Sequence, residues 1–414
     1  MTAMPVQAAP YSPADDFSSA DGELLINGLK VSRVAAMAGR TPFYAYDRSR
    51  IEARVGLLRS LLPAGVQLHY AMKANPMQAL VGFMAQRVDG LDVASSGELR
   101  VALDAGMAPS RISFAGPGKR ADELRQALAA GVLLNVESAR EVELLASLSE
   151  ESGWPARVAV RINPDFEMRA SGMRMGGGAK PFGVDAEAVP ALLRRIGGLG
   201  LAFEGFHLYA GSQNLNAESL IDMQRRSFDL MLRLADEAPA MPKILNLGGG
   251  FGIPYFRNDH PLALEPVCEA LACIVEEVST KLPGAELVLE LGRYLVGEAG
   301  VYICRVIDCK VSRGQKFVVV DGGMHHHLAA AGLFGQVVRR NYPVVVANRI
   351  GAPSNGQVNV VGPLCTPLDV LADKVDLTEV HPGDLIAVFQ SGAYGFSSSP
   401  TAFLGHPEPA QLLV

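Results

Sequence analysis

After Tyr44, short apolar runs alternate with longer segments in which apolar residues recur every three or four positions. The short runs predict eight β-strands, at Val66–Ala71, Leu91–Ala94, Ile112–Ala115, Val132–Val136, Arg157–Ile162, Phe203–Tyr209, Ile244–Leu247 and Leu287–Leu291. The longer segments predict helices between them, among them Ser96–Ala105, Arg120–Ala130, Ala139–Glu151 and Ala217–Ala238. Alternating strands and helices of this number are typical of a closed parallel (β/α)8 barrel.

From about Glu290 the pattern changes to short β-branched runs separated by Gly, Pro or Asn. These runs are Val301–Ser312, Lys316–Val320, Tyr342–Ala347, Gln357–Val361 and Asp384–Phe389. They predict an all-β module, and the early strand-like segment Leu24–Ile26 is expected to join it. The expected domains are therefore residues 1–40 as a tail with a strand of the β domain, 41–286 as the barrel, and 287–414 as the C-terminal β domain.

Composition and charge exclude several classes of protein. The 414 residues carry a net charge of −6, with 49% hydrophobic and 19% charged residues, which gives no electrostatic footprint for nucleic acid or an anionic membrane. No apolar stretch is long enough to span a bilayer, and Met1 to Ala20 lacks the pattern of a secretory signal. The five cysteines show no paired metal-ligand spacing, so free thiols in a reducing cytoplasm are expected.

Polar or glycine residues mark all eight expected strand ends, where the chemistry of such barrels collects. In chain order they are Lys73, Asp92 with Ser95, Gly116, Glu137, Arg161 with Asn163, His207, Gly248–Gly250, and Glu290 with Arg293. A lone lysine at a strand end is most often a solvated side chain. In a partly dry site, however, a lysine can lose its proton and attack a carbonyl. Because the other seven strand ends also carry polar or glycine residues, we favour a Schiff-base role for Lys73.

Each of these residues has a plausible role around pyridoxal phosphate, beside a structural alternative. Gly248–Gly250 would let backbone N–H groups approach a phosphate, or would form a tight turn. Arg293 would add a cation to that phosphate, or pair with a surface acid. Glu290 would keep a pyridine nitrogen protonated and the ring electron-poor. His207 would stack on the ring or be a satisfied core histidine, and Arg161 would hold a neighbouring group or form a salt bridge inside the barrel.

Two motifs in the β module carry further candidates. Cys365 follows the rigid Gly-Pro turn of GPLCT and can act as an acid, or be a small buried hydrophobe. Tyr394 lies between glycines in SGAYG and can bond a phosphate, or be an aromatic plug. His325–His327 cannot all point one way and have no completing ligand, so no metal site is predicted. The glycine-rich loop Met173–Lys180 is expected to be a lid or a flexible surface loop.

With these motifs the chain resembles the fold-type III pyridoxal-phosphate decarboxylases, the group of diaminopimelate and ornithine decarboxylases. The resemblance runs from about Thr41 to the C-terminus through YAMKANP, DVASSGEL, FAGPGK, RINPD, GGGFG, ELGR, GPLC and SGAYG. It implies a TIM-like barrel joined to a β-sandwich or β-barrel domain of the alanine racemase type. It also implies a homodimer that shares its active sites head to tail.

The resemblance also implies roles for individual residues. Lys73 would bind the cofactor covalently, His207 would stack on it, Glu290 would face its ring nitrogen, and Cys365 of the other subunit would donate a proton. The implied cofactor contacts are Lys73, Asp92, Arg161, His207, Gly248, Gly249, Gly250, Glu290, Gly292, Arg293 and Tyr394.

Departures from the family pattern concern the substrate. Thr366 stands where an acid usually holds the substrate's distal amine. The segment His207–Ser212 leaves the usual phosphate serine unassigned, and Asp321–Leu328 replaces the typical diaminopimelate pattern. With Arg340–Pro343 and the ending Ser399–Pro407, these departures resemble a branch that includes decarboxylases of exosortase and exopolysaccharide loci and relatives acting on carrier-protein-bound or siderophore-conjugated amino acids.

The sequence therefore predicts a pyridoxal-phosphate-dependent α-decarboxylase, a carboxy-lyase that releases an amine and carbon dioxide. We expect a conjugated or distally neutral amino acid as substrate, contacted by Thr366 and, at a remote carboxylate, by Arg339 or Arg340. One alternative is an amino-acid racemase of the same fold, which needs a base on each face of Cα. Another is a catalytically silent homologue that binds a partner protein; such a chain would be expected to lose Lys73 or Cys365.

Overall fold

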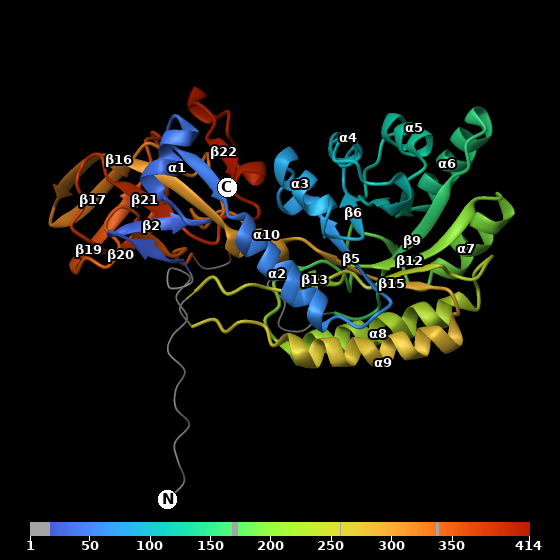
Figure 1. Ribbon diagram of the computed structural model, residues 1–414. Coiled ribbons are helices and arrows are strands. Elements are labelled where there is room, and N and C mark those ends of the chain that lie inside the picture. Colours follow the sequence, from blue (N-terminus) through green and yellow to red (C-terminus); the bar gives the residue numbers. More distant parts are fainter. Residues whose placement is uncertain (1–16, 168–172, 257, 337–338) are drawn as a thin grey trace, which may run out of the picture. The chain divides into compact units, whose positions relative to one another are not determined.

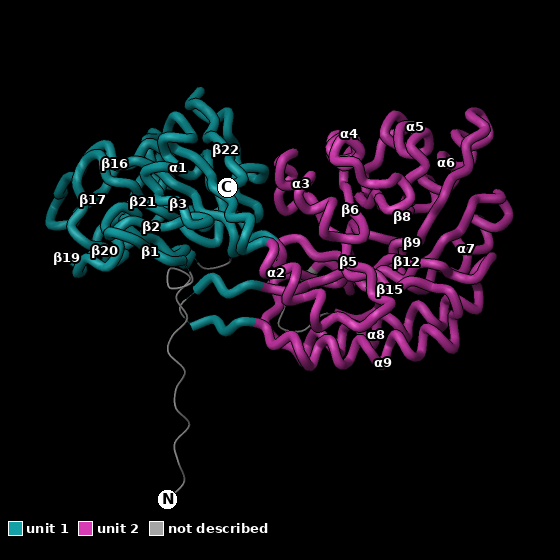
Figure 2. Tube along the Cα trace, in the orientation of Figure 1, with its two compact units in different colours: residues 1–51, 253–261, 296–414 teal, residues 52–252, 262–295 magenta. Residues whose placement is uncertain are grey.

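The computed structural model describes residues 17–167, 173–256, 258–336 and 339–414. The chain divides into two compact units (Figures 1 and 2). Residues 52–252 and 262–295 form one unit, which we call the barrel unit. Residues 1–51, 253–261 and 296–414 form the other, which we call the β unit.

The barrel unit is built on a ring of parallel strands, which confirms the predicted barrel. The strands are β5 (Val66–Ala71), β6 (Gly90–Val93), β7 (Ile112–Phe114), β8 (Leu133–Val136), β9 (Arg157–Asn163), β12 (Ala202–Leu208), β14 (Ile244–Asn246) and β15 (Glu286–Leu291). The ring closes because β15 pairs with β5 and β8 pairs with β9. The strands begin and end within one or two residues of the predicted positions, because strands buried on both sides read as continuous apolar runs.

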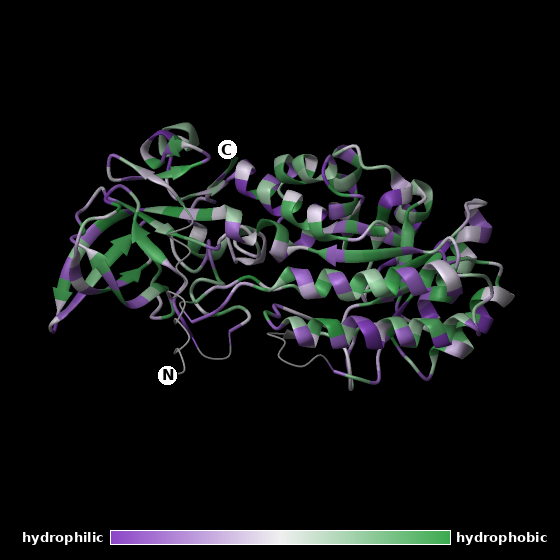
Figure 3. Ribbon diagram, turned by 60° about the horizontal axis from the view of Figure 1, so that its bottom comes forward, coloured by the Kyte–Doolittle hydropathy of each residue, from purple (hydrophilic) through white to green (hydrophobic). Residues whose placement is uncertain are grey.

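Helices follow the strands around the barrel (Figure 1). They are α3 (Gln78–Ala85), α4 (Ser96–Asp104), α5 (Ala121–Ala130), α6 (Ala139–Ser152), α7 (Val189–Gly198), α8 (Ala217–Ala235) and α9 (Leu264–Lys281), with α2 (Arg48–Leu61) and the short α10 (Arg293–Val296). Figure 3 shows apolar and polar stretches alternating along them, as expected of helices that cover a sheet on one face. Three short strands, β10 (Met173–Arg174), β11 (Val184–Asp185) and β13 (Gly211–Ser212), were not predicted.

Side-chain caps fix where several of these helices begin. The hydroxyl of Ser95 accepts a hydrogen bond from the Glu98 N–H, and that of Ser138 accepts one from the Glu141 N–H, each at 3.2 Å. Each cap satisfies an otherwise unpaired N–H of a first helical turn. Only two residues therefore separate β6 from α4 and β8 from α6, which keeps these two loops short. The capping role of Ser95 explains why a polar residue follows the end of β6.

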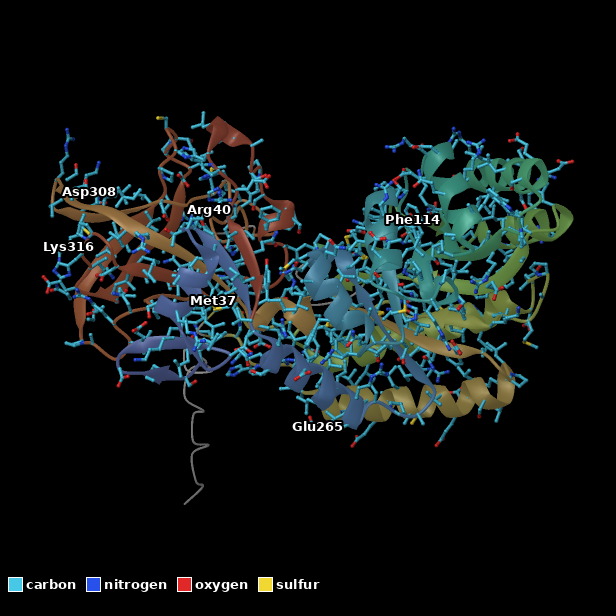
Figure 4. The ribbon with its side chains drawn as sticks, turned by 45° about the horizontal axis from the view of Figure 1, so that its top comes forward. Met37, Arg40, Phe114, Glu265, Asp308 and Lys316 are labelled. Carbon is cyan, nitrogen blue, oxygen red and sulfur yellow. The ribbon has the colours of Figure 1, made fainter. Side chains whose placement is uncertain are left out.

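The β unit is a mixed sheet around β16 (Gly300–Ser312). Its other strands are β4 (Phe43–Tyr46), β17 (Gln315–Val320), β18 (Val344–Val346), β19 (Ser354–Val361), β20 (Val370–Thr378), β21 (Leu385–Val388) and β22 (Ala410–Leu413). β16 is antiparallel to β4, β17 and β21, whereas β17–β19 and β22–β4 are parallel pairs. Asp308 and Lys316, labelled in Figure 4, are exposed residues of β16 and β17.

The N-terminal strands belong to the same core. β1 (Ser19–Ala20), β2 (Glu23–Ile26) and β3 (Leu29–Lys30) form a small sheet followed by α1 (Val31–Ala38). Leu24 and Ile26 are buried with Phe43, Ile303 and Phe389 in one apolar cluster. The Leu24 N–H donates to the Ala347 carbonyl at 2.7 Å, which ties the early segment to the end of β18.

The boundaries between the two units differ from the expected ones, which lay after residue 40 and after residue 286. β4 hydrogen-bonds to β16 and β22 and so belongs to the β unit, as do residues 253–261. β15 closes the barrel between β14 and β5, so residues 287–295 belong to the barrel unit. Within the described residues, no helix combines the length and the apolar character needed to cross a membrane.

Candidate active site at the carboxyl end of the barrel strands

A buried carboxylate lies at the centre of the candidate site. Glu290, near the end of β15, is 5% exposed. Its Oε1 lies 3.8 Å from Lys73 Nζ, and its Oε2 lies 3.1 Å from Nε2 of the buried His207. The structure thus brings together three of the predicted site residues, from β15, from the turn after β5 and from β12.

The surrounding cations decide the charge of Glu290. Burial alone raises the pKa of its carboxyl group, but the adjacent His207 imidazole and the charges of Lys73 and Arg161 lower it. The net result is a pKa well below the ordinary value. Glu290 is therefore an anion at neutral pH in a place where an isolated carboxylate would be protonated.

Lys73 reaches this carboxylate from a tight turn. It lies in the 3-10 turn η1 (Met72–Ala74) directly after β5, with its Nζ 4.7 Å from the centre of the Tyr209 ring. A Cβ on Gly292 would lie 3.0 Å from the Ala71 carbonyl oxygen and from the Ala74 Cβ. Glycine at 292 therefore lets the end of β15 approach the lysine turn closely. The Lys73 side chain is 38% exposed, so its amine is open to a small molecule.

The triple glycine forms a sharply bent loop after β14. Gly248 and Gly250 have φ of 68° and 87°, the region that favours glycine. A Cβ on Gly249 would lie 2.1 Å from the Glu290 carbonyl oxygen. The Gly248 N–H donates to Asn246 Oδ1 at 2.8 Å, but in the described part of the chain the N–H groups of Gly249 and Gly250 have no acceptor. Arg293, which opens α10, is half-buried.

Arg161 is held by a second buried carboxylate. Its Nη1 donates to Glu137 Oε1 at 2.8 Å, so the salt-bridge alternative describes its contact. The carboxylate of Glu137 also accepts from the N–H groups of Gly116 and Gly183. Burial raises the pKa of Glu137, yet the charges of Arg161 and Lys119 lower it below the usual value. Glu137 therefore ties three loops and Arg161 together.

Lys119 supports this carboxylate and was not among the predicted site residues. Its side chain is buried beside Phe114, which Figure 4 labels in the barrel unit, with Nζ 5.9 Å from the ring centre. Nζ donates to the carbonyls of Gly116 and Asn135 and lies 2.7 Å from Glu141 Oε1. The sequence signal that could have identified Lys119 is its position at the end of the FAGPGK motif.

Asp92 has one occupied and one open oxygen. Its Oδ1 lies 3.1 Å from His69 Nδ1 and accepts a hydrogen bond from the Ser113 hydroxyl. Its Oδ2 is buried and has no hydrogen-bond partner among the described residues. Neither His69 nor Ser113 was predicted as a site residue. The sequence signal that could have identified His69 is a histidine within the apolar run Val66–Ala71.

The remaining predicted site residues belong to the β unit. Cys365 is exposed, and its loop is anchored because Asp369 Oδ2 accepts from the Leu364 N–H at 2.8 Å. Thr366 is half-buried, and its hydroxyl oxygen accepts from the Leu368 N–H at 3.3 Å. Tyr394 has a positive φ of 54° and is half-buried.

The two arginines proposed for the substrate differ in their contacts. Arg339 donates from Nη2 to the Val370 carbonyl at 2.7 Å, and Gly332 leaves room for its side chain. Arg340 lies over the Phe256 ring, 3.5 Å from its centre, and 4.0 Å from Asp259 Oδ1. Its side chain remains 57% exposed, so its charge is accessible.

The three consecutive histidines have separate surroundings. Nε2 of His326 lies 3.0 Å from the Pro407 carbonyl oxygen, and Nε2 of His327 lies 2.9 Å from the Ser391 hydroxyl. Both ring nitrogens of His325 are buried and have no hydrogen-bond partner in the described residues. In the described part of the predicted lid loop, the N–H groups of Met175 and Gly176 donate to the Ala210 carbonyl.

Comparisons with known proteins identify the family of this chain. The family described as pyridoxal-dependent decarboxylase, pyridoxal binding domain, matches residues 48–297. The chain is 39% identical to the L-glutamyl-[BtrI acyl-carrier protein] decarboxylase of Niallia circulans, over 93% of this chain and 92% of the relative. It is 28% identical to the 2-[(L-alanin-3-ylcarbamoyl)methyl]-2-hydroxybutanedioate decarboxylase of Staphylococcus aureus, over 92% of this chain and 95% of that protein. The structure resembles a diaminopimelate decarboxylase from M. jannaschii in complex with L-lysine, with a TM-score of 0.88, 26% identity and coverage of 97% and 93% of the two chains.

Proposed function

This chain belongs to the pyridoxal-dependent decarboxylases, and on that premise we propose that it decarboxylates an amino acid whose far end is conjugated or neutral. The activity is pyridoxal-phosphate-dependent decarboxylation of an amino acid, so the protein is a carboxy-lyase. Its relatives are named decarboxylases, which favours this activity over the racemase and over a protein without catalysis.

The residues of the barrel unit fit the cofactor. Asp92 Oδ2 and His207 Nδ1 are buried atoms without hydrogen-bond partners among the described residues, and such atoms are rare unless a ligand completes them. The N–H groups of Gly249 and Gly250 are likewise open to an acceptor. Bound pyridoxal phosphate supplies a carbonyl carbon for amines and a ring that withdraws electrons from Cα. We propose that Gly248–Gly250, Gly292, Arg293 and Tyr394 surround its phosphate.

Lys73 is proposed to hold the cofactor covalently. Its amine lies beside an anion and an aromatic face, and it is partly exposed. An incoming amine can therefore reach the same place without a rearrangement of the barrel.

Glu290 is proposed to face the ring nitrogen. The pKa of its carboxyl group is well below the ordinary value because His207, Lys73 and Arg161 surround it, so it presents a negative charge at neutral pH. A buried anion stabilises a positive charge on the atom beside it far more than a solvated one does. His207, held against the same carboxylate, would pack on the ring face, and Arg161 is fixed by Glu137.

Cys365 is proposed to return a proton to Cα from the partner subunit of a homodimer. Its thiol is exposed at the surface of the β unit, where a second copy can use it, and its loop is anchored by Asp369. A thiol needs a reducing environment to remain an acid, which is consistent with the expected cytoplasm.

The substrate proposal depends on the charge around Thr366. The acid nearest to it in sequence, Asp369, is 2% exposed, and its oxygens accept from the N–H groups of Met324 and Leu364. Asp369 is therefore occupied, and Thr366 itself offers no charge for a distal ammonium group. A neutral amide or ester at the far end of the substrate needs no such partner. Two relatives are named for acting on conjugated amino acids, and Arg340 is an exposed cation for a remote carboxylate.

The proposal is tested by offering the enzyme both kinds of substrate. Mass spectrometry measures the rate at which each substrate loses one carboxyl group. We expect this rate to be at least about tenfold higher for glutamyl-carrier protein or a citryl conjugate than for lysine, ornithine or diaminopimelate. T366D should raise activity on a free diamino acid, because it supplies the missing charge, whereas T366V should not. Fast turnover of a free diamino acid by the unmodified enzyme would contradict the proposal.

A further inference from the structure

The interior of the barrel contains a connected set of polar side chains next to Glu290. Nδ1 of His69 lies 3.1 Å from Asp92 Oδ1, the Ser113 hydroxyl donates to that same oxygen, and Asn135 Nδ2 donates to the Ser113 hydroxyl at 3.3 Å. All four residues are buried. Barrel interiors are usually filled with branched aliphatic side chains, so a polar chain here needs a reason other than packing.

The sequence makes room for the His69 ring. In the strand register His69 pairs with Gly90 on β6 and with Glu290 on β15. A Cβ on Gly90 would lie 2.4 Å from Nε2 of His69 and 2.5 Å from its Cε1, so only glycine leaves space for the ring. The ring also lines a cavity of about 30 Å³ with Ser113, Asn135 and Asn246. A cavity of this size has room for one or two water molecules, which its polar side chains can bind.

The charges around His69 are mainly negative. Burial lowers the pKa of its imidazole, but the charge and hydrogen bond of Asp92 and the charges of Glu290 and Asp89 raise it above the ordinary value. Arg111 and Glu286, which also line the cavity, form an ion pair with each other. These carboxylates therefore favour the protonated form of the imidazole.

We infer that His69 is a positioning residue, whose imidazole fixes Asp92 Oδ1 and leaves Oδ2 available to the pyridoxal cofactor. This inference rests on the proposed function and deepens it. With Oδ1 committed to His69 and Ser113, the carboxylate cannot rotate freely, and its second oxygen is buried without a partner among the described residues. His69 also lies on the strand between those of the buried carboxylates Asp92 and Glu290, and the charges of both raise the pKa of its imidazole.

Two variants of His69 separate the hydrogen bond from the charge. H69F removes both and should weaken binding of pyridoxal phosphate to the apoenzyme by at least about tenfold, the cost of a lost hydrogen bond to a charged group. H69Q retains a donor and should stay within about threefold of the unmodified protein at pH 7. Because the imidazolium loses its proton as pH rises, affinity in the unmodified protein should fall at alkaline pH, and H69Q should lack this fall.

The measurement is a titration of apoenzyme with pyridoxal phosphate from pH 6.5 to 9.5, followed by cofactor absorbance, with melting temperature as a check of folding. H381Q, a change at a half-exposed histidine of the β unit, is the matched control and should bind as the unmodified protein does. If H69F binds with unchanged affinity, or if H69Q retains the alkaline fall, the inference is wrong. If H69F does not fold, the pH profile of H69Q decides. If the unmodified protein itself does not bind the cofactor, the proposed function fails instead.

Discussion

The two units bury their histidines in opposite electrostatic surroundings. In the barrel unit His207 contacts Glu290 and His69 contacts Asp92, so each imidazole has a carboxylate partner. In the β unit the partners of His326 and His327 are neutral, and burial lowers the pKa of each to about 3. Burial alone therefore lowers the pKa of a histidine, whereas the charge and hydrogen bond of Asp92 raise the pKa of the equally buried His69. The charged interior belongs to the unit that carries the cofactor-binding motif.

The largest effect is expected from K73A. It removes the proposed covalent attachment and the cation beside Glu290, and we expect kcat to fall by at least about 10³-fold. Steady-state kinetics on a conjugated substrate, with the cofactor absorbance band recorded in parallel, checks this. K281A, which changes a half-exposed lysine of α9, serves as control and should leave both readings unchanged. A K73A enzyme with near-normal turnover would contradict the assignment.

E290Q replaces the carboxylate beside His207 with a neutral amide, so that His207, like His326 and His327 in the β unit, has a neutral neighbour. The amide keeps a polar group of the same size beside His207 but cannot balance a charged ring nitrogen, so kcat should fall roughly 10²- to 10³-fold. E286Q is the matched control on the same strand, because Glu286 forms only a half-exposed ion pair with Arg111. Equal losses in the two variants would show that the strand, and not the charge of Glu290, is responsible.

C365A tests whether the β unit contributes to the chemistry at all. Removal of a general acid should lower kcat by roughly 10²-fold, with little change in melting temperature because the thiol is exposed. C273A, at an exposed cysteine of α9, is the control. Mixing C365A with K73A subunits should restore part of the activity if the two residues act in one shared site. No recovery in the mixture would argue against sharing between subunits.

The smallest effect concerns the neutral histidines. Burial and the nearby His406 lower the pKa of His325 to about 4, from a usual 6.5. Below pH 6.5 the unfolded chain takes up a proton that the folded chain accepts only near pH 4, so stability is lost as pH falls through this window. H325L should reduce the loss of stability between pH 7 and pH 5 by roughly 2 kcal/mol. Thermal melts at both pH values measure it, and an unchanged pH dependence would contradict the neutral assignment.

Much of the barrel could be predicted because its signals are local. The strands are continuous apolar runs, and the caps Ser95 and Ser138 lie beside them in sequence. β20 was missed because a positive φ at Lys374 and shifts in register interrupt its alternation of buried and exposed residues. β22 was missed because its partner β4 is more than 360 residues earlier in the chain, and a short parallel edge strand has no local signature.

The sequence indicated which residues form the site, but not which of them contact each other. The motifs indicated Lys73, His207 and Glu290, and the structure places them around one carboxylate. Which cation meets which acid depends on how distant strands come together. His69 was therefore only a polar residue in an apolar run until the register placed it between Gly90 and Glu290.

Reductive labelling tests the central claim most directly. Treatment of the holoenzyme with borohydride followed by peptide mapping should place one phosphopyridoxyl group on the peptide that contains Lys73. The K73A variant should carry none. A label on another lysine of the unmodified enzyme, or no label after full loading with the cofactor, would contradict the account.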